Sequence, residues 1–251
     1  MAGRGSAVRK PDEDPFPGRS VLEGAFALLE TLAERNEAGL AALVAGSGLP
    51  KTTAYRLLEQ LTELGAVERH GTCYRVGSRI FRLGRQWQPH PGLRAAARQP
   101  LQRLAGTTGA SVCLCVLREG RTMAATGISG MVDELAPLQA GATWPWTTAA
   151  GKLLVATGPP AVPLGPLPTS WKREAKAIQE SEVAVDREEL IPGVCCVAVP
   201  VSLPRGKVVG ALCAMVDPAQ DLRRLARIVT QASRAVGAVL CDGRATALGA
   251  R

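Results

Sequence analysis

The sequence lacks any apolar run approaching the roughly 20 residues that a membrane helix needs, and no apolar segment typical of a secretory signal follows its charged N-terminus. Both absences predict a cytoplasmic protein with no membrane partner. Aromatic residues make up only 4%, so the core must consist mostly of alanine, valine and leucine. The seven cysteines have no regular spacing, which in the cytoplasm predicts reduced thiols rather than a disulfide framework.

Positive charge exceeds negative charge, and the excess is unevenly distributed along the sequence. Thirty Lys and Arg against 22 Asp and Glu give a formal net charge of +8. Residues 1–50 carry five basic and seven acidic side chains, whereas residues 51–85 carry seven basic and three acidic ones, a net +4. A local basic excess favours a polyanionic partner if the fold gathers it on one surface.

The first helix is predicted to begin at a capping box. In this motif the hydroxyl of Ser20 and the carboxylate of Glu23 satisfy backbone N–H groups at the helix start. Apolar residues follow at helical spacing, which predicts that they face the core. This apolar stripe consists of Leu22, Phe26, Leu29 and Ala33.

Two more helices and a hairpin are predicted next. A short helix around residues 40–44 ends at the glycine turn 46–48. Pro50 suits the first position of a third helix, whose apolar stripe consists of Ala54, Leu57, Leu58, Leu61 and Leu64. Extended pieces at 67–69 and 73–76 then read as a hairpin. Three helices followed by a hairpin predict a winged helix-turn-helix.

The remaining chain predicts a second, larger domain. Strand patterns at 110–117, 194–201 and 207–215, with helical patterns between them and a final helix at 220–240, favour an α+β fold with an antiparallel sheet. We therefore expect a disordered tail (1–19), a winged helix-turn-helix domain (20–77), a linker helix (78–91), an α+β domain (92–245) and a short tail (246–251).

Residue types needed for catalysis are sparse. The two histidines, His70 and His90, both precede residues 92–245, so a Ser–His or Cys–His pair is excluded there. Neither a Walker loop nor a glycine-rich dinucleotide fingerprint occurs. His70 and Cys73 have no second pair of ligands for zinc, and the acidic run at 186–189 is typical of a solvated edge. We expect no enzyme activity, no cofactor and no metal site.

Several stretches resemble the IclR family of bacterial transcription regulators. The matching segments are SVLEGAFALLETL, GLPKTTAYRLLEQLTELGAVER, YRVGSRIFRLG, TTAAGKLLVA and VDREELIPGVCCVAVPV, in this order between Ser20 and about Leu240. The resemblance implies an N-terminal winged helix joined to a C-terminal GAF-like effector-binding domain, in a homodimer or dimer of dimers. The implied function is transcription regulation: binding to a double-stranded DNA operator, controlled by an unknown small-molecule effector.

The third helix is the expected recognition helix, because the major groove admits such a helix and its N-terminal residues meet base edges. With its apolar stripe inward, Arg56 is placed to donate two hydrogen bonds to guanine. Lys51 and the hydroxyls after it suit phosphates near the helix N-terminus. The predicted DNA-binding residues are Lys51, Thr52, Thr53, Tyr55, Arg56, Arg69 and Arg75.

The resemblance also implies an effector pocket. Carried over by position, Ala149 and Ala150 present backbone N–H groups at a helix start, and Asp186 and Cys196 match pocket positions. Cys213 and Met215 stand where family members that bind small keto-acids carry serine, and Trp146 belongs to a segment where smaller residues are common. We expect a less polar pocket, suited to an aromatic or larger ligand, or one no longer used.

Two alternatives remain open. One is a redox-responsive regulator, because Cys195 and Cys196 are adjacent and Cys113 and Cys115 alternate on one strand face, so that thiols can lie close together across a sheet. Buried, inert cysteine is the commoner outcome for such residues. The other is an enzyme or ligand carrier that never binds DNA. Loss of DNA binding on replacing Lys51 and Arg56 separates that alternative from a regulator.

Overall fold

The computed structural model describes residues 20–158 and 164–248. The chain divides into two compact units between Trp87 and Gln88, which falls within the segment expected to be a linker. The tail expected at 1–19 lies outside the described residues. No helix within them is both long and apolar enough to cross a membrane.

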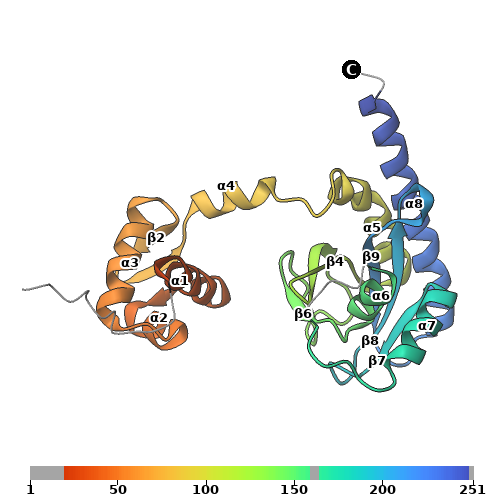
Figure 1. Ribbon diagram of the computed structural model, residues 1–251, viewed down its shortest axis with the longest axis horizontal. Coiled ribbons are helices and arrows are strands. Elements are labelled where there is room, and N and C mark those ends of the chain that lie inside the picture. The colour runs from red at the N-terminus through yellow and green to blue at the C-terminus, as the bar shows by residue number, and fades with distance from the viewer. Residues whose placement is uncertain (1–19, 159–163, 249–251) are drawn as a thin grey trace, which may run out of the picture. The chain divides into compact units, whose positions relative to one another are not determined.

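The N-terminal unit is a winged helix-turn-helix (Figure 1). Its elements are α1 (Val21–Arg35), β1 (Ala38–Gly39), α2 (Leu40–Ser47), α3 (Lys51–Glu63), β2 (Val67–His70), β3 (Cys73–Val76) and α4 (Ser78–Gln86). The three strands form an antiparallel sheet in the order β1-β3-β2. The predicted hairpin is confirmed, and Gly71 at its tip has a φ of +61°, a left-handed conformation that glycine adopts without strain.

The predicted capping box at the start of α1 is confirmed, but the predicted core face of this helix is wrong except at Leu29, which is half-buried against the core. The Ser20 hydroxyl accepts from the Glu23 N–H at 3.2 Å, and the Glu23 carboxylate accepts from the Ser20 N–H at 2.6 Å. Leu22 and Phe26 are 72% and 63% exposed. The buried face instead consists of Gly24, Leu28, Thr31 and Leu32.

The close packing of α1 against α3 explains this choice of face. A side-chain carbon at position 24 would lie only 3.1 Å from Leu57 Cδ1. Because Gly24 has no such carbon, the face of α1 that contains it lets the two helices approach closely. Leu28 and Leu32 on the same face are fully buried in the core of the unit. The apolar stripe containing Leu22 and Phe26 is thereby left on the surface.

The predicted inner face of α3 is confirmed except at its end. Ala54, Leu57, Leu58 and Leu61 are buried. Leu64 is 55% exposed, because the helix ends at Glu63 and Leu64 is its C-terminal cap. Pro50 is the N-terminal cap of this helix rather than its first residue, so the helix begins one residue later than predicted, at Lys51.

The C-terminal unit is the predicted α+β domain. Its helices are α5 (Leu93–Thr108), α6 (Ala149–Thr157), α7 (Trp171–Ser181) and α8 (Leu222–Leu248), with a 3-10 turn η1 (Pro204–Gly206). Its strands are β4 (Ser111–Arg118), β5 (Arg121–Ile128), β6 (Thr143–Pro145), β7 (Ala184–Arg187), β8 (Cys195–Ser202) and β9 (Val208–Val216). All six strands pair antiparallel in the order β6-β5-β4-β9-β8-β7.

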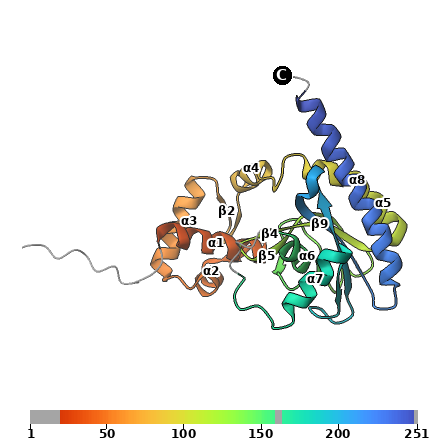
Figure 2. The same ribbon diagram turned by 45° about the vertical axis from the view of Figure 1, so that its right-hand side comes forward.

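Each face of this sheet carries its own helices and its own core (Figure 2). Helices α5 and α8 cover one face, where Val112, Leu114 and Leu212 are fully buried. Helices α6 and α7 lie on the other face, where Cys113, Cys115 and Cys213 point. Successive side chains of a strand point to opposite faces, so Val112, Leu114 and Val116 of β4 face one core, whereas Cys113 and Cys115 face the other.

Two predicted boundaries in this unit differ from the structure. Helix α5 continues through Pro100 to Thr108, because Pro100, Leu101 and Leu104 are buried in the core and this packing compensates for the missing backbone hydrogen bond. Helix α8 extends to Leu248, so residues 246–248 of the expected tail are helical. Residues 249–251 lie outside the described part.

Candidate functional site

The outer face of α3 is polar and carries most of the predicted DNA-binding residues. Lys51, Thr52, Tyr55 and Arg56 are exposed, and Thr53 is half-buried. They flank the buried stripe because residues three and four apart share one face of a helix. The side chains predicted to meet bases and phosphates therefore occupy one accessible surface at the start of the helix.

The N-terminus of α3 is suited to an anion. Pro50 caps it without a side-chain hydrogen bond, and the first turn contains no acidic residue. The first backbone N–H groups of a helix have no partner within the helix and carry partial positive charge. Lys51 adds a full charge at the same end, so a phosphate would meet an ammonium group and backbone donors together.

The two hairpin arginines already have partners within the protein. Arg75 forms an ion pair with Glu68 at 3.2 Å, and Glu68 also accepts from the Ser78 N–H. The Arg69 guanidinium lies 5.9 Å from the centre of the Tyr74 ring, and its Nε donates to the carbonyl of Gly71. Both side chains are exposed, but Arg75 would share its charge between Glu68 and a phosphate.

The C-terminal unit contains a small, partly open cavity between the sheet and the segments that follow β7, with a volume of about 50 Å³. Most of its lining is apolar, and the polar groups include two threonine hydroxyls and one carboxylate. The lining residues are Cys113, Cys115, Thr122, Ala136, Trp144, Thr148, Ala150, Asp186, Leu190, Ile191, Val194, Cys196, Cys213 and Met215.

Five of the seven predicted effector residues line this cavity, namely Ala150, Asp186, Cys196, Cys213 and Met215. Trp146 and Ala149 do not. Trp146 instead packs edge-on against Trp171, with ring centres 4.9 Å apart, and Ala149 is fully buried in the core. Trp144, two residues before Trp146, contributes the indole that faces the cavity.

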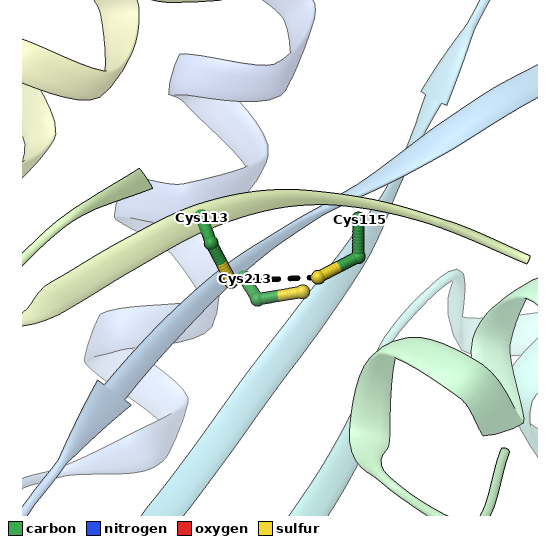
Figure 3. Close-up of side chains that lie close together, drawn as sticks. All are labelled: Cys113, Cys115 and Cys213. Atoms are coloured by element: carbon green, nitrogen blue, oxygen red, sulfur yellow. Dashed lines mark hydrogen bonds between the residues drawn. The ribbon is translucent and has the colours of Figure 1, made fainter. Parts of the chain in front are cut away.

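Three of the lining cysteines meet at one point. Cys113 and Cys115 project from β4 toward Cys213 on β9 (Figure 3). A hydrogen bond of 3.4 Å joins the sulfurs of Cys113 and Cys115. Hydrogen bonds from Cys115 and Cys213 lower the pKa of Cys113, whereas the bonds to Cys113 and then burial raise the pKa of Cys115 and Cys213. Sequence reasoning placed Cys113 and Cys115 on one strand face without assigning them to a pocket.

Asp186 is the buried acid of the cavity. Its Oδ1 accepts from the backbone N–H of Glu189 at 2.9 Å. Burial raises the pKa of Asp186 above its ordinary value, and the hydrogen bond from Glu189 only partly offsets this effect. The side chain pairs across the strands with Cys196, which also lines the cavity.

Asp186→Asn is expected to increase the free energy of unfolding at neutral pH. A carboxyl whose pKa is raised on folding binds its proton more tightly when folded, so its ionisation costs stability as the pH rises above the ordinary value of 3.8. Asparagine has no charge and keeps an oxygen for the Glu189 N–H. Urea unfolding should show the gain at pH 7 and none at about pH 3; an equal loss at both pH values would contradict it.

Lys152 links α6 to two other segments next to the cavity. It is buried, and its ammonium contacts Glu174 on α7 at 2.9 Å and Glu189 after β7. Burial alone would lower the pKa of Lys152, but the hydrogen bonds to Glu189 and Glu174 outweigh it, and the pKa is raised. The expectation that the acidic run at 186–189 is a solvated edge is therefore wrong at two positions, because Asp186 is buried and Glu189 forms an ion pair with Lys152.

Lys152→Ala is expected to lower the free energy of unfolding by about 2 kcal/mol, because charge-assisted hydrogen bonds of a buried group are lost while the two half-exposed carboxylates regain water. The matched control is Lys176→Ala on α7. Lys176 pairs with Glu180 at 3.8 Å on the surface, and its loss should cost less than about 0.5 kcal/mol. Equal effects of the two variants in chemical denaturation would refute the structural role of Lys152.

Comparison with known proteins points to one family. Residues 21–71 match the family model of the IclR helix-turn-helix domain. The chain is 30% identical over 208 residues to a glycerol operon regulatory protein of Streptomyces coelicolor, covering 76% of this chain and 82% of that protein. It is 29% identical over 215 residues to the probable transcriptional regulator SauR of Cupriavidus necator, covering 78% and 85%.

Solved structures share the fold. An IclR homologue from Microbacterium hydrocarbonoxydans, solved in complex with 4-hydroxybenzoate, superposes with a TM-score of 0.77 at 20% identity, covering 87% of this chain and 98% of that chain. A transcriptional regulator from Alicyclobacillus acidocaldarius superposes with a TM-score of 0.70 at 22% identity, covering 87% and 96%.

Proposed function

Because this chain belongs to the IclR family of DNA-binding transcription regulators, we propose that its operator occupancy is controlled by a small molecule bound in the C-terminal cavity. The proposal includes a cytoplasmic location, since bacterial operators lie in the cytoplasm, and the absence of enzyme activity. The observation that carries it is a single chain with two separate sites: an exposed helix face with Lys51 and Arg56 and no side-chain cap at its N-terminus in one unit, and a largely apolar cavity in the other.

In this proposal α3 enters the major groove of the operator. Arg56 donates to a base edge, and Lys51 with the N-terminal backbone N–H groups holds a phosphate. Thr52, Thr53 and Tyr55 add contacts to the DNA backbone. The wing, which is the β2–β3 hairpin, extends the contact through Arg69 and Arg75. The pairing of Arg75 with Glu68 predicts a smaller contribution from this side chain than from Arg56.

We propose that the chain acts as a homodimer or dimer of dimers. Large apolar side chains exposed on two helices of the N-terminal unit support this, because burying them in an interface would remove apolar surface from water. Leu22 and Phe26 are exposed on α1, and Phe81 and Leu83 are exposed on α4. A twofold dimer would present two copies of α3 to two operator half-sites.

The proposed effector has an apolar body. Trp144, Leu190 and Ile191 provide apolar walls, while the hydroxyls of Thr122 and Thr148 lie 3.2 Å apart and offer polar contacts. The enzyme alternative has less support, because the cavity lining contains no histidine that could activate its cysteine thiols as nucleophiles. His90 belongs to the C-terminal unit but contacts the carbonyl of Pro91.

Selection from random duplex DNA with the full chain tests the proposal. We expect enrichment of a sequence with twofold symmetry, because protein symmetry is mirrored in half-sites about one helical turn apart or a multiple of it. The selected duplex then serves to screen small molecules for loss or gain of DNA affinity. Recovery of no common sequence would contradict operator binding by this chain.

A further inference from the structure

Three thiols in the C-terminal cavity are arranged like the ligands of a metal ion. The sulfur atoms of Cys113, Cys115 and Cys213 all lie within 4.8 Å of one another, and all three residues are buried. In Figure 3 the side chains converge from two strands on one point. Within residues 20–158 and 164–248, this is the only group of three histidine, cysteine or acidic residues close enough to share an ion.

The position of the cluster is fixed by the sheet. Cys113 lies directly opposite Cys213 in the antiparallel pairing of β4 with β9. Cys115 is two residues further along β4 and therefore points to the same face. These strands are central in the six-stranded sheet and are paired on both sides, so the three side chains project from a rigid backbone rather than from loops.

The spacing fits metal–thiolate geometry. With metal–sulfur bonds of about 2.3 Å, three sulfurs around one ion lie about 4 Å apart in a trigonal plane. The sulfurs of Cys113 and Cys115 lie 3.4 Å apart, and no two sulfurs of the group are more than 4.8 Å apart. Small side-chain rotations would bring all three into bonding distance of a central ion without movement of the strands.

We propose that Cys113, Cys115 and Cys213 bind one copper(I) ion in a three-sulfur site, and that this ion is a second ligand of the cavity, besides the apolar effector, that changes operator binding. The second part rests on the proposed function, because it assumes that occupancy of the cavity controls DNA binding. Each thiol that becomes a thiolate breaks its S–H bond, forms a copper–sulfur bond and releases a proton to solvent. Copper remains copper(I), so no electron is transferred.

The donor set favours copper(I) over zinc. Structural zinc sites take four ligands close together in a tetrahedron, whereas only the sulfurs of Cys113, Cys115 and Cys213 lie within 4.8 Å of one another; the Cys196 thiol hydrogen-bonds with Cys213 but lies outside that group. Soft thiolate and thioether donors select copper(I), and the only other sulfur atoms that line the cavity are those of Cys196 and Met215. The cluster is also buried, which protects bound copper(I) from oxidation by solvent species.

Anaerobic titration of the full-length protein tests the site. Copper(I) is supplied from its complex with a chromogenic chelator, under a reductant that has no thiol, and chelator absorbance reports transfer to the protein. We expect one equivalent per protomer with affinity sufficient to strip the chelator. Transfer of no copper, or preferential binding of zinc in a parallel titration, would overturn the proposal.

Variants assign the site to the three cysteines. Cys113→Ala with Cys213→Ala should abolish copper transfer. Cys195→Ala is the matched control, since Cys195 is equally buried on β8 but faces the opposite core, and it should bind copper normally. Ultraviolet absorption from thiolate-to-copper charge transfer provides a second readout: it should rise to one equivalent in the wild-type and Cys195→Ala proteins. Wild-type protein that takes up copper without this absorption would refute the assignment to thiolates.

Operator binding measured on the same samples separates the two proposals. Copper(I) should change the affinity for the selected duplex at least tenfold in the wild-type protein and not in the Cys113→Ala, Cys213→Ala variant. Protein that binds the duplex but takes up no copper overturns the metal site alone. Protein that takes up copper but selects no duplex overturns the proposed function and leaves the metal site standing.

Discussion

Replacing Lys51 and Arg56 together with alanine is expected to weaken binding to the selected operator by about 100-fold. Arg56 in a bidentate contact with guanine contributes about 1–3 kcal/mol of discrimination, and every 1.4 kcal/mol corresponds to a tenfold change in affinity. Loss of Lys51 removes a charge from the phosphate site at the start of α3. Both side chains are exposed, so the fold should be unaffected. Fluorescence anisotropy with a labelled duplex measures the change.

The matched control for this double variant is Arg98→Ala with Arg103→Ala on α5. Both are exposed helical arginines, but they lie in the C-terminal unit, so their removal changes the net charge equally without touching α3. Operator affinity should stay within about twofold of the wild type. If this control weakened binding as much as the first double variant, net charge rather than the surface of α3 would account for the affinity.

Gly151→Ala is expected to lower the free energy of unfolding by about 3 kcal/mol. A side-chain carbon at this position of α6 would lie 2.2 Å from the Trp146 carbonyl oxygen and 2.4 Å from the Thr122 hydroxyl. The first of these contacts is with backbone, so relief requires movement of the whole helix away from the sheet, and overpacking of this kind typically costs 1–3 kcal/mol or more. Chemical denaturation measures the loss.

Gly106→Ala provides the control, because it introduces the same methyl group into another helix. Nothing lies within 4 Å of the added carbon in α5, and alanine is the better helix former by about 0.5–1 kcal/mol. This variant should be as stable as the wild type or slightly more stable. A Gly151→Ala protein that unfolds at the same denaturant concentration as Gly106→Ala would contradict the close packing of α6.

Local signals explain why the N-terminal unit could be predicted almost entirely from the sequence. The capping box at Ser20, the glycine turn after α2 and the hairpin tip at Gly71 each act within a few residues. Local signals of this kind could not predict which face of α1 is buried. Two stripes on this helix have helical spacing, and the more apolar one, which contains Phe26, is exposed because close approach of α3 requires the face with Gly24.

The cavity was predictable only in part because it is built by pairing between distant strands. Trp144 and Trp146 are two residues apart, and the sequence gives no sign of which one faces the cavity. Trp171 on α7 decides this by packing against Trp146. Likewise, the alternation of Cys113 and Cys115 predicted a shared face, but the alignment of Cys213 with Cys113 depends on the register of β4 with β9.

The central claim, that this chain recognises a specific DNA sequence through α3, is tested most directly by a salt series. The full-length protein is titrated into the selected duplex and into a shuffled duplex of equal length and composition. We expect saturable binding that is at least 1,000-fold tighter for the selected duplex and that weakens steeply as salt rises, because phosphate contacts release counterions. Weak binding of equal strength to both duplexes at every salt concentration would contradict the claim.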